Sequence, residues 1–369
     1  MIYVSERLKM PLTATASLIT ISSVIGLLSS FLAGPVIDRV GRKWLMVISL
    51  SVNGVYFFML SHAETLPVFT FLMGLGGVVN PLYRIGVDAM MATLISPEKR
   101  PDAYSLLCMS NNVGIALGSV IGRVLAATSY KLAFYGAAAG MVVYSLLLLL
   151  FAVETLPRLK NPEAKIFQPK EKFGGYGDIL KDIPFISLIA AFTLVQVCAV
   201  LVCVLLGVYA NQNYHVPESQ YGLIPTTNAI MVVTLQMAFT QVTKRYSSLP
   251  VLMIGALFYT MATGSVAVGQ GFWGFWISMV IMTIGELILV PTASTYVANL
   301  APADKRGRYM SLAGLTWGAA SGIGPVFGGF LNDNLGPHSI WWGSAFTRLL
   351  SVMSFLFLSV RNPAPTSSY

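Results

Sequence analysis

Several ionisable residues lie inside long apolar stretches, where a charge needs a chemical reason. Glu286 is close to the middle of the apolar run 272–298. If such a run crosses a membrane, a charge at its centre costs about 2.5–3.5 kcal/mol. Loss of water disfavours the charged form of a carboxyl group, so Glu286 could take up and release a proton or pair with a cation. The alternative is a glutamate that only joins two helices by a hydrogen bond.

Three further charged residues, Arg84, Asp88 and Arg348, also lie inside apolar runs. Arg84 and Asp88 are four residues apart, so on a helix they could form an ion pair on one face. Such a pair could be structural, or Arg84 could be a switch that Asp88 holds in one state and another acid holds in the other. Arg348 has no acidic neighbour in its run, so its partner must come from another helix, and Glu286 is one candidate. Arg123 lies near a helix end and can reach the membrane surface.

The composition is that of a membrane protein. Hydrophobic residues make up 55% of the 369 residues, charged residues only 10%, and the mean hydropathy is +0.71. Soluble domains have about 25% charged residues, so we predict an all-α polytopic membrane protein. The three cysteines lack the spacing of a zinc site or a disulfide framework, and the three histidines fall in predicted outer loops. We expect neither a metal nor another cofactor.

The elements that must position these residues are membrane-spanning helices, since about 20 apolar residues cross a hydrocarbon core of about 30 Å. Eleven runs qualify: 11–33, 44–61, 66–92, 103–127, 131–153, 183–210, 219–242, 250–268, 272–298, 309–331 and 340–360. The long connection between the fifth and sixth runs is rich in Lys, Pro and Gly and is predicted to be a solvated linker. The predicted domains are an N-terminal bundle (1–153), this linker (154–182) and a C-terminal bundle (183–369).

Lysine and arginine predict the orientation. If Gly34–Lys43 is cytoplasmic and the runs alternate, 17 of these cations are cytoplasmic, 3 are outside and 3 lie within runs. Cytoplasmic loops of membrane proteins are enriched in Lys and Arg, so we expect a cytoplasmic C-terminus and a location in the cell (inner) membrane. The net charge of +8 then needs no nucleic-acid partner.

The chain repeats itself at a shift of 206 residues. Glu98-Lys99-Arg100 matches Asp304-Lys305-Arg306, and Gly118 and Gly122 match Gly324 and Gly328. Duplicated halves are typical of transporters that bind substrate between the two halves, near the membrane midplane. The run 183–210 has no counterpart in the first half. We therefore expect a chain that lacks its first transmembrane helix, and the alternative is a genuine eleven-helix protein.

A charged segment with apolar runs on both sides has the sequence Gly34-Pro35-Val36-Ile37-Asp38-Arg39-Val40-Gly41-Arg42-Lys43, which predicts a tight turn. Its pattern resembles the loop between the second and third helices of major facilitator transporters. The segment Gly322-Ile323-Gly324-Pro325-Val326-Phe327-Gly328-Gly329 is similar to the Gly-Pro motif that the drug/proton antiporter branch carries in helix five. Two departures are Ser119, where that motif would place proline in helix five, and Thr70, where the family has arginine.

The resemblance implies the major facilitator fold, with two pseudo-symmetric six-helix bundles of which eleven helices are present. It implies that Asp38 accepts hydrogen bonds from the N-terminus of the helix starting near Tyr309, where the helix dipole favours an anion. That contact would close the cytoplasmic side. The expected latch residues are Gly34, Asp38, Arg39, Gly41 and Arg42. The alternative for Asp38 is a solvated turn carboxylate. Lys244 stands at the equivalent position of the second half, so we expect this latch once only.

Other residues of the runs have two possible roles. Polar side chains could line a central cavity or form hydrogen bonds between helices. The candidates are Asn111, Asn112, Gln196, Asn228 and Gln236. Small residues four apart favour close helix packing. The residues of this kind, with the proline beside them, are Gly118, Gly122, Gly324, Pro325 and Gly328.

Three functions can be compared. The first is proton-coupled efflux of small hydrophobic or cationic compounds by alternating access. The alternative is proton-coupled transport of a metabolite such as a sugar or an amino acid. A membrane enzyme is disfavoured because Asp88 is the one aspartate in the runs, no histidine lies near Glu286 and no phosphate-binding loop is found. The expected partners are protons, a small-molecule substrate and the lipid bilayer, and we expect the protein to be a monomer.

Overall fold

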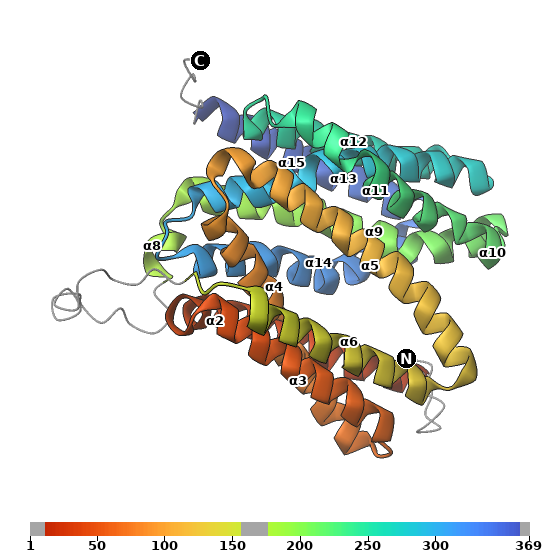
Figure 1. The fold of residues 1–369 in the computed structure, drawn as a ribbon. Coiled ribbons are helices and arrows are strands. Elements are labelled where there is room, and N and C mark those ends of the chain that lie inside the picture. The colour runs from red at the N-terminus through yellow and green to blue at the C-terminus, as the bar shows by residue number, and fades with distance from the viewer. Residues whose placement is uncertain (1–11, 156–175, 362–369) are drawn as a thin grey trace. The chain divides into compact units, whose positions relative to one another are not determined.

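The computed structural model describes residues 12–155 and 176–361 of the chain. Every regular element within these ranges is a helix (Figure 1). The long helices are α2 (Leu12–Val40), α3 (Arg42–His62), α4 (Leu66–Leu94), α5 (Arg100–Thr128), α6 (Tyr130–Phe151), α9 (Ile183–Tyr214), α11 (Leu223–Thr243), α12 (Ser248–Val268), α13 (Gly271–Leu300), α14 (Arg306–Leu335) and α15 (Ser339–Arg361). Short helical segments are η1 (Pro97–Lys99), α8 (Gly177–Leu180) and α10 (Glu218–Tyr221).

The helices have the length and composition of membrane spans. Each of the eleven predicted runs corresponds to one long helix. In the described ranges, ten helices are long and apolar enough to cross a membrane, and α14 is not among them although it has 30 residues. In a lipid interior only structures that satisfy their own backbone hydrogen bonds are stable, which explains why these apolar runs form helices. The protein is a multi-pass membrane protein.

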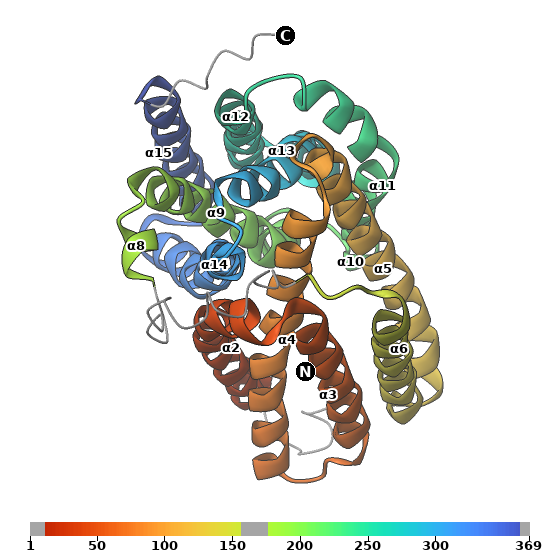
Figure 2. The ribbon, with the colours of Figure 1, turned by 60° about the vertical axis from the view of Figure 1, so that its left-hand side comes forward.

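The chain divides into two compact units by its internal contacts. Unit 1 contains α2, α3, α4 and α6, and unit 2 contains α9, α11, α12 and α15, with nearly all of α13 (Figure 2). The helices α5 and α14 each contribute to both units: α5 changes unit after Ala116 and α14 after Gly318.

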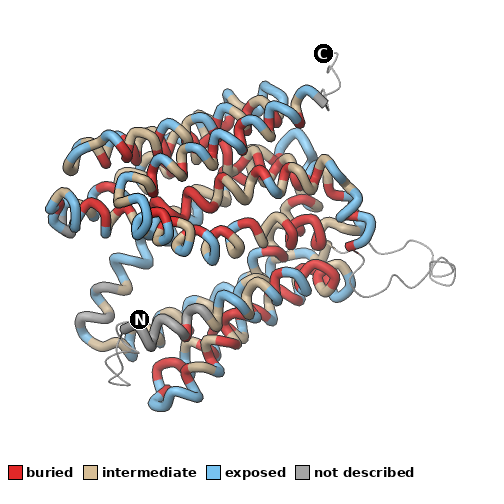
Figure 3. Tube along the Cα trace, turned by 180° about the vertical axis from the view of Figure 1, so that it is seen from behind, coloured by how far each residue is buried: buried red, intermediate tan, exposed pale blue. Residues whose placement is uncertain are grey.

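Within unit 1, α2 packs against α4, and α3 packs against both α4 and α6. Hydroxyl groups join these helices: Ser49 donates to the carbonyl of Val79 at 2.6 Å, and the hydroxyls of Ser51 and Ser145 are 2.9 Å apart. Within unit 2, α15 packs against α9 and α12. Buried and exposed residues alternate along the helices (Figure 3), and many large apolar side chains, such as Phe151, are exposed, which suits contact with lipid.

The predicted turn between the first two runs is shorter than expected. Helix α2 continues through Val40, and α3 begins at Arg42, so Gly41 alone separates them. Gly41 has φ +108°, a conformation that L side chains rarely adopt. Pro35 lies inside α2, where its missing N–H leaves the carbonyl of Phe31 without its helical partner.

The internal repeat extends to the helix ends. Adding 206 to the bounds of α3 gives 248–268, which are the bounds of α12. The same shift moves α4 to 272–300 and α5 to 306–334, against observed bounds of 271–300 for α13 and 306–335 for α14. The two halves therefore share element positions as well as residues.

Candidate functional site

The carboxylate of Asp38 lies at the N-terminus of α14, inside unit 1. Its Oδ1 accepts a hydrogen bond from the Gly307 N–H at 2.8 Å, and its Oδ2 accepts one from the Arg308 N–H at 3.2 Å. The first N–H groups of a helix have no partner within the helix, and they lie at the positive end of its dipole. The geometry is that of an anion held by a helix N-terminus. We call Gly34, Asp38, Gly307, Arg308 and Ser311 the α2–α14 junction.

Two glycines allow the helices of this junction to approach. A Cβ atom on Gly34 would lie 2.7 Å from the Arg308 Cα, and one on Gly307 would lie 2.8 Å from the Gly34 carbonyl oxygen. Both distances are shorter than real Cβ contacts, and both involve backbone atoms, which cannot turn aside. Glycine at 34 and 307 is therefore a requirement of the close contact between α2 and α14.

Arg42 is fully buried behind the junction. Its Nη1 donates to the hydroxyl of Thr93 and, at 3.2 Å, to the carbonyl of Thr155. Arg306 donates to the same Thr93 hydroxyl at 3.0 Å. A buried guanidinium with several acceptors ties the start of α3 to α4 and to the residues after α6. The predicted latch residue Arg39, by contrast, has an exposed side chain.

Glu154, which the sequence placed in a solvated linker, caps helix α3. Its Oε1 accepts from the Arg42 N–H at 3.0 Å, and its Oε2 accepts from the Lys43 N–H at 3.2 Å. A Cβ atom on Gly41 would lie 2.6 Å from Oε2, so glycine there also leaves room for the carboxylate. The signal that could have found Glu154 is an acidic residue directly after an apolar run.

A second polar cluster lies in unit 2, where the structure brings together two predicted residues. Asn228 of α11 donates from Nδ2 to the Glu286 Oε2 at 2.7 Å, and its amide also lies 2.9 Å from the Thr283 hydroxyl. We call Asn228, Thr283 and Glu286 the Glu286 cluster. This carboxyl group has one strong amide partner and no basic side chain bonded to it within the described residues.

Arg348 does not pair with Glu286, which was one candidate for its partner. Its Nη1 donates to the Tyr259 carbonyl at 2.5 Å, and its guanidinium carbon lies 4.6 Å from the centre of the Tyr259 ring. Across the part of the chain that the structure describes, no hydrogen bond or ion pair joins Arg348 to Glu286. The side chain is fully buried between α15 and α12, so the nearest carbonyl and ring take the place of a carboxylate.

Arg84 reaches α14 within unit 1. Its Nη2 donates to the Gly314 carbonyl at 2.9 Å. Asp88, one turn further along α4, is near enough to interact with the charge of Arg84. The carbonyl contact gives Arg84 a partner outside its own helix, which the spacing of the two charges had not suggested.

The remaining cavity candidates have different surroundings. Gln236 is fully buried and donates to the Leu287 carbonyl at 2.9 Å, so it joins α11 to α13 and does not line a cavity. Asn112 donates to the carbonyl of Cys108 in its own helix at 3.0 Å. Asn111 is exposed and Gln196 is half-buried.

The predicted packing glycines also differ from one another. A Cβ atom on Gly324 would lie 3.1 Å from the Val197 carbonyl, and one on Gly328 would lie 2.5 Å from the Leu201 side chain. These two positions, beside Pro325, do support close contact of α14 with α9. A Cβ atom on Gly118 or Gly122 in α5 would have no described atom of another element within 4 Å, so the expected contact is not seen there.

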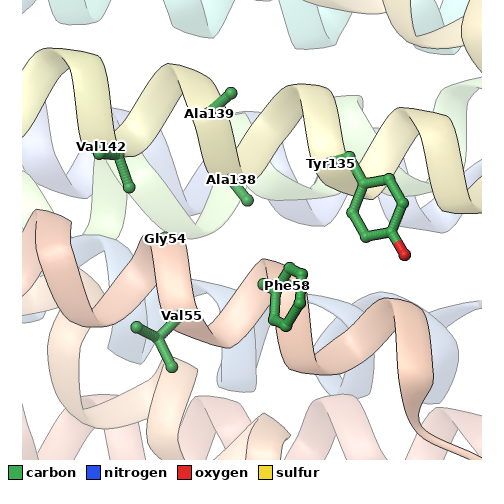
Figure 4. Close-up of a pocket in the computed structure, with 7 residues that line it drawn as sticks. All are labelled: Gly54, Val55, Phe58, Tyr135, Ala138, Ala139 and Val142. Atoms are coloured by element: carbon green, nitrogen blue, oxygen red, sulfur yellow. The ribbon is translucent and has the colours of Figure 1, made fainter.

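A shallow apolar pocket lies between α3 and α6 (Figure 4). Its lining is Gly54, Val55, Phe58, Tyr135, Ala138, Ala139 and Val142. None of these residues belongs to the predicted site.

The position that corresponds to the α2–α14 junction in the repeat holds a different contact. Adding 206 to Asp38 gives Lys244, and subtracting 206 from Arg308 gives Asp102. Lys244 Nζ lies 2.9 Å from Asp102 Oδ2 within unit 2, and Gln241 donates to Asp102 Oδ1 at 3.1 Å. The helix N-terminus of the first junction is replaced by an ion pair in the second.

The family model described as the Major Facilitator Superfamily matches residues 1–212 and 199–368. The chain belongs to the Major Facilitator Superfamily. This superfamily member is 24% identical over 373 residues to a Na(+), Li(+), K(+)/H(+) antiporter of Planococcus maritimus, a match that covers 93% of the chain and 85% of the relative. It is 27% identical over 303 residues to the multidrug resistance protein MdtH of Citrobacter koseri, covering 81% of the chain and 73% of the relative.

Solved structures share the fold of this superfamily member. The human organic anion transporter MFSD10 superposes with a TM-score of 0.79 at 18% identity, covering 96% of the chain and 88% of that protein. The transporter FucP in its outward conformation superposes with a TM-score of 0.76 at 14% identity, covering 94% and 90%. The eleven long helices are therefore those of a major facilitator transporter.

Proposed function

We propose that this superfamily member is a secondary active transporter that exports small hydrophobic or cationic compounds in exchange for protons, and that it is not an enzyme. The observation that carries the proposal is the Glu286 cluster. An ionisable group on a membrane helix is costly and is functional by default. Glu286 has an amide donor and no bonded cation among the described residues, so it is available to a proton or to a positively charged substrate.

The relatives support this choice. One is named as a cation/proton antiporter and another as a multidrug resistance protein, and both match most of the chain. In the proposed cycle, Glu286 binds a proton from the outer side of the membrane. On the cytoplasmic side it releases this proton and binds a cationic substrate, which it then releases outside when the next proton binds. A carboxyl group that accepts either partner, but not both together, couples their movements in opposite directions.

The α2–α14 junction supplies the conformational part of the proposal. Asp38 at the α14 N-terminus stabilises one of the two alternating states, because its two hydrogen bonds exist only while the helices are in contact. From the distribution of Lys and Arg we place this junction and the C-terminus in the cytoplasm, and the protein in the inner membrane. We propose that the monomer is the transporting unit.

A second candidate is proton-coupled uptake of a metabolite. One structural neighbour is a fucose:proton symporter, which has the same fold at 16% identity. The same Glu286 cluster could couple protons to a neutral substrate. The two candidates differ in the compound that moves and in its direction relative to the proton.

The test is a flux assay in proteoliposomes with an imposed pH gradient. The cationic dye ethidium is the first probe, and L-fucose and leucine test the metabolite alternative. We expect Glu286→Gln to abolish ethidium movement driven by the gradient. Glu64→Gln, which removes the same charge in the connection between α3 and α4, is the control and should behave like the wild type. Equal gradient-driven flux in wild type and Glu286→Gln would remove Glu286 from the coupling step.

A further inference from the structure

The last residues before the C-terminal half were predicted to belong to a solvated linker, yet Tyr176 is buried, with 6% of its surface exposed. Its ring stacks on Phe31 of α2, with the ring centres 4.4 Å apart. Its hydroxyl donates to the Phe31 carbonyl at 2.5 Å and lies 2.8 Å from the Ser311 hydroxyl of α14. All of these residues belong to unit 1. One side chain therefore contacts both helices of the α2–α14 junction.

The Phe31 carbonyl needs this donor. Proline at 35 has no N–H, so the hydrogen bond that would close this turn of α2 is absent. A partly buried carbonyl without a hydrogen-bond donor destabilises the fold, and the Tyr176 hydroxyl replaces the missing donor. Tyr176 thus supplies the hydrogen bond that α2 lacks at this turn, although the two are far apart in the sequence.

The contact also lies beside Gly34, where α2 closely approaches α14. A Cβ atom on Gly34 would be 2.8 Å from the Tyr176 hydroxyl and 2.7 Å from the Ser311 hydroxyl. Two residues further on, Asp178 Oδ2 is 3.0 Å from Lys305 Nζ, directly before α14. Because Asp178 is exposed, this pair contributes little by itself, but it joins the same segment to the same end of α14.

We propose that Tyr176 is a positioning residue of the α2–α14 junction: its hydroxyl joins the Phe31 carbonyl to Ser311 and so stabilises the closed junction. The described residues 176–178, which precede the C-terminal half, are then part of the latch. The effect of Tyr176 on transport rests on the proposed transport cycle. Its effect on the distance between α2 and α14 does not, because that distance is measured without transport.

The test measures that distance directly in the full chain. Spin labels are placed on cysteines introduced at Val40 and Asp304, two exposed positions on either side of the junction, after the native cysteines 108, 198 and 203 are replaced by alanine. Electron–electron distance measurements in proteoliposomes then give the fractions of closed and separated junctions. We expect Tyr176→Phe, which keeps the ring, to raise the ratio of separated to closed junctions roughly 2- to 10-fold, the range for one lost hydrogen bond. Tyr246→Phe changes an exposed tyrosine of another connection and should leave the ratio unchanged.

A second variant separates this role from general damage. Pro35→Ala restores an N–H that can bond to the Phe31 carbonyl, so the junction no longer depends on Tyr176 for that bond. We expect Tyr176→Phe to change the ratio less in the Pro35→Ala chain than in the wild-type chain. An unchanged distance distribution in Tyr176→Phe, or an equal effect of this substitution in both chains, overturns the inference. Neither outcome depends on whether Glu286 couples protons or which compound is carried.

Discussion

At the scale of single residues, two carboxylates of unit 1 have similar roles, because each accepts hydrogen bonds at a helix N-terminus. Asp38 accepts from the first N–H groups of α14, and Glu154 accepts from those of α3. The residue types are those that a helix N-terminus favours, and burial of the junction makes the interaction stronger than at an open surface. The Asp38 contact joins α2 to α14, two helices that are far apart in the sequence.

Asp38→Asn tests this contact. The amide oxygen can replace one acceptor, but the negative charge at the helix N-terminus is lost, which costs about 1 kcal/mol. We expect exchange of substrate across proteoliposome membranes to slow about fivefold while the amount of protein inserted in the membrane stays normal. Exchange rates and membrane protein levels are measured together. Unchanged exchange would show that the contact does not set the rate of the cycle.

At the scale of elements, the approach of α2 to α14 depends on glycine at both contact points. The helices would be held apart by any side chain at 34 or 307, because the opposing atoms belong to the backbone. Gly322, in the same helix α14, has open space around its Cβ position. The two glycines of α14 therefore make a matched pair for an experiment.

We expect Gly307→Ala to prevent close contact at the junction and to reduce substrate exchange by at least about tenfold, the factor that corresponds to 1.4 kcal/mol. Gly322→Ala should leave exchange unchanged and, through the better helix propensity of alanine, stabilise the protein by up to about 1 kcal/mol. Thermal unfolding in detergent and exchange in proteoliposomes distinguish the two. If both substitutions behave alike, the close contact of the backbones is not what the glycine provides.

At the scale of the whole molecule, the repeat relates the two junctions. Asp38 with α14 in the first corresponds to Lys244 with Asp102 in the second. The duplicated chain kept the location of the contact and changed its chemistry from an anion at a helix N-terminus to an ion pair. Because the pair is partly exposed, its contribution to stability is at most about 1 kcal/mol.

This pair can be tested by exchanging its charges. We expect Lys244→Asp alone to slow substrate exchange, since it places two carboxylates within reach of each other. The double variant Lys244→Asp with Asp102→Lys should recover most of the rate, and the effect of the single variant should shrink in high salt. Failure of the double variant to recover would mean that the two side chains act separately.

Much of the fold could be predicted because its signals are local. Apolar length identified all eleven long helices, and the shift of 206 residues relates the ends of α12 and α14 to those of α3 and α5 within one residue. The end of α2 was misjudged, since charged residues in its last turn looked like a loop while the backbone stays helical to Val40. Hydropathy marks where a helix can sit in lipid, whereas hydrogen bonds determine where it stops.

The hydrogen-bond partners of the site residues could not be predicted from the sequence. Glu286, Asn228 and Asp38 could be selected as candidates from the sequence, because they are polar residues in or beside apolar runs. Placing a polar side chain in a membrane costs free energy, so such residues usually have a functional or structural role. Only the tertiary structure placed Asn228 on Glu286, gave Arg348 the Tyr259 carbonyl, and brought Glu154 and Tyr176 to the latch. Hydropathy and periodicity are local properties of the sequence, so they predict which segments form apolar helices. The pairing of hydrogen-bond donors with acceptors depends instead on the packing of helices that are far apart in the sequence.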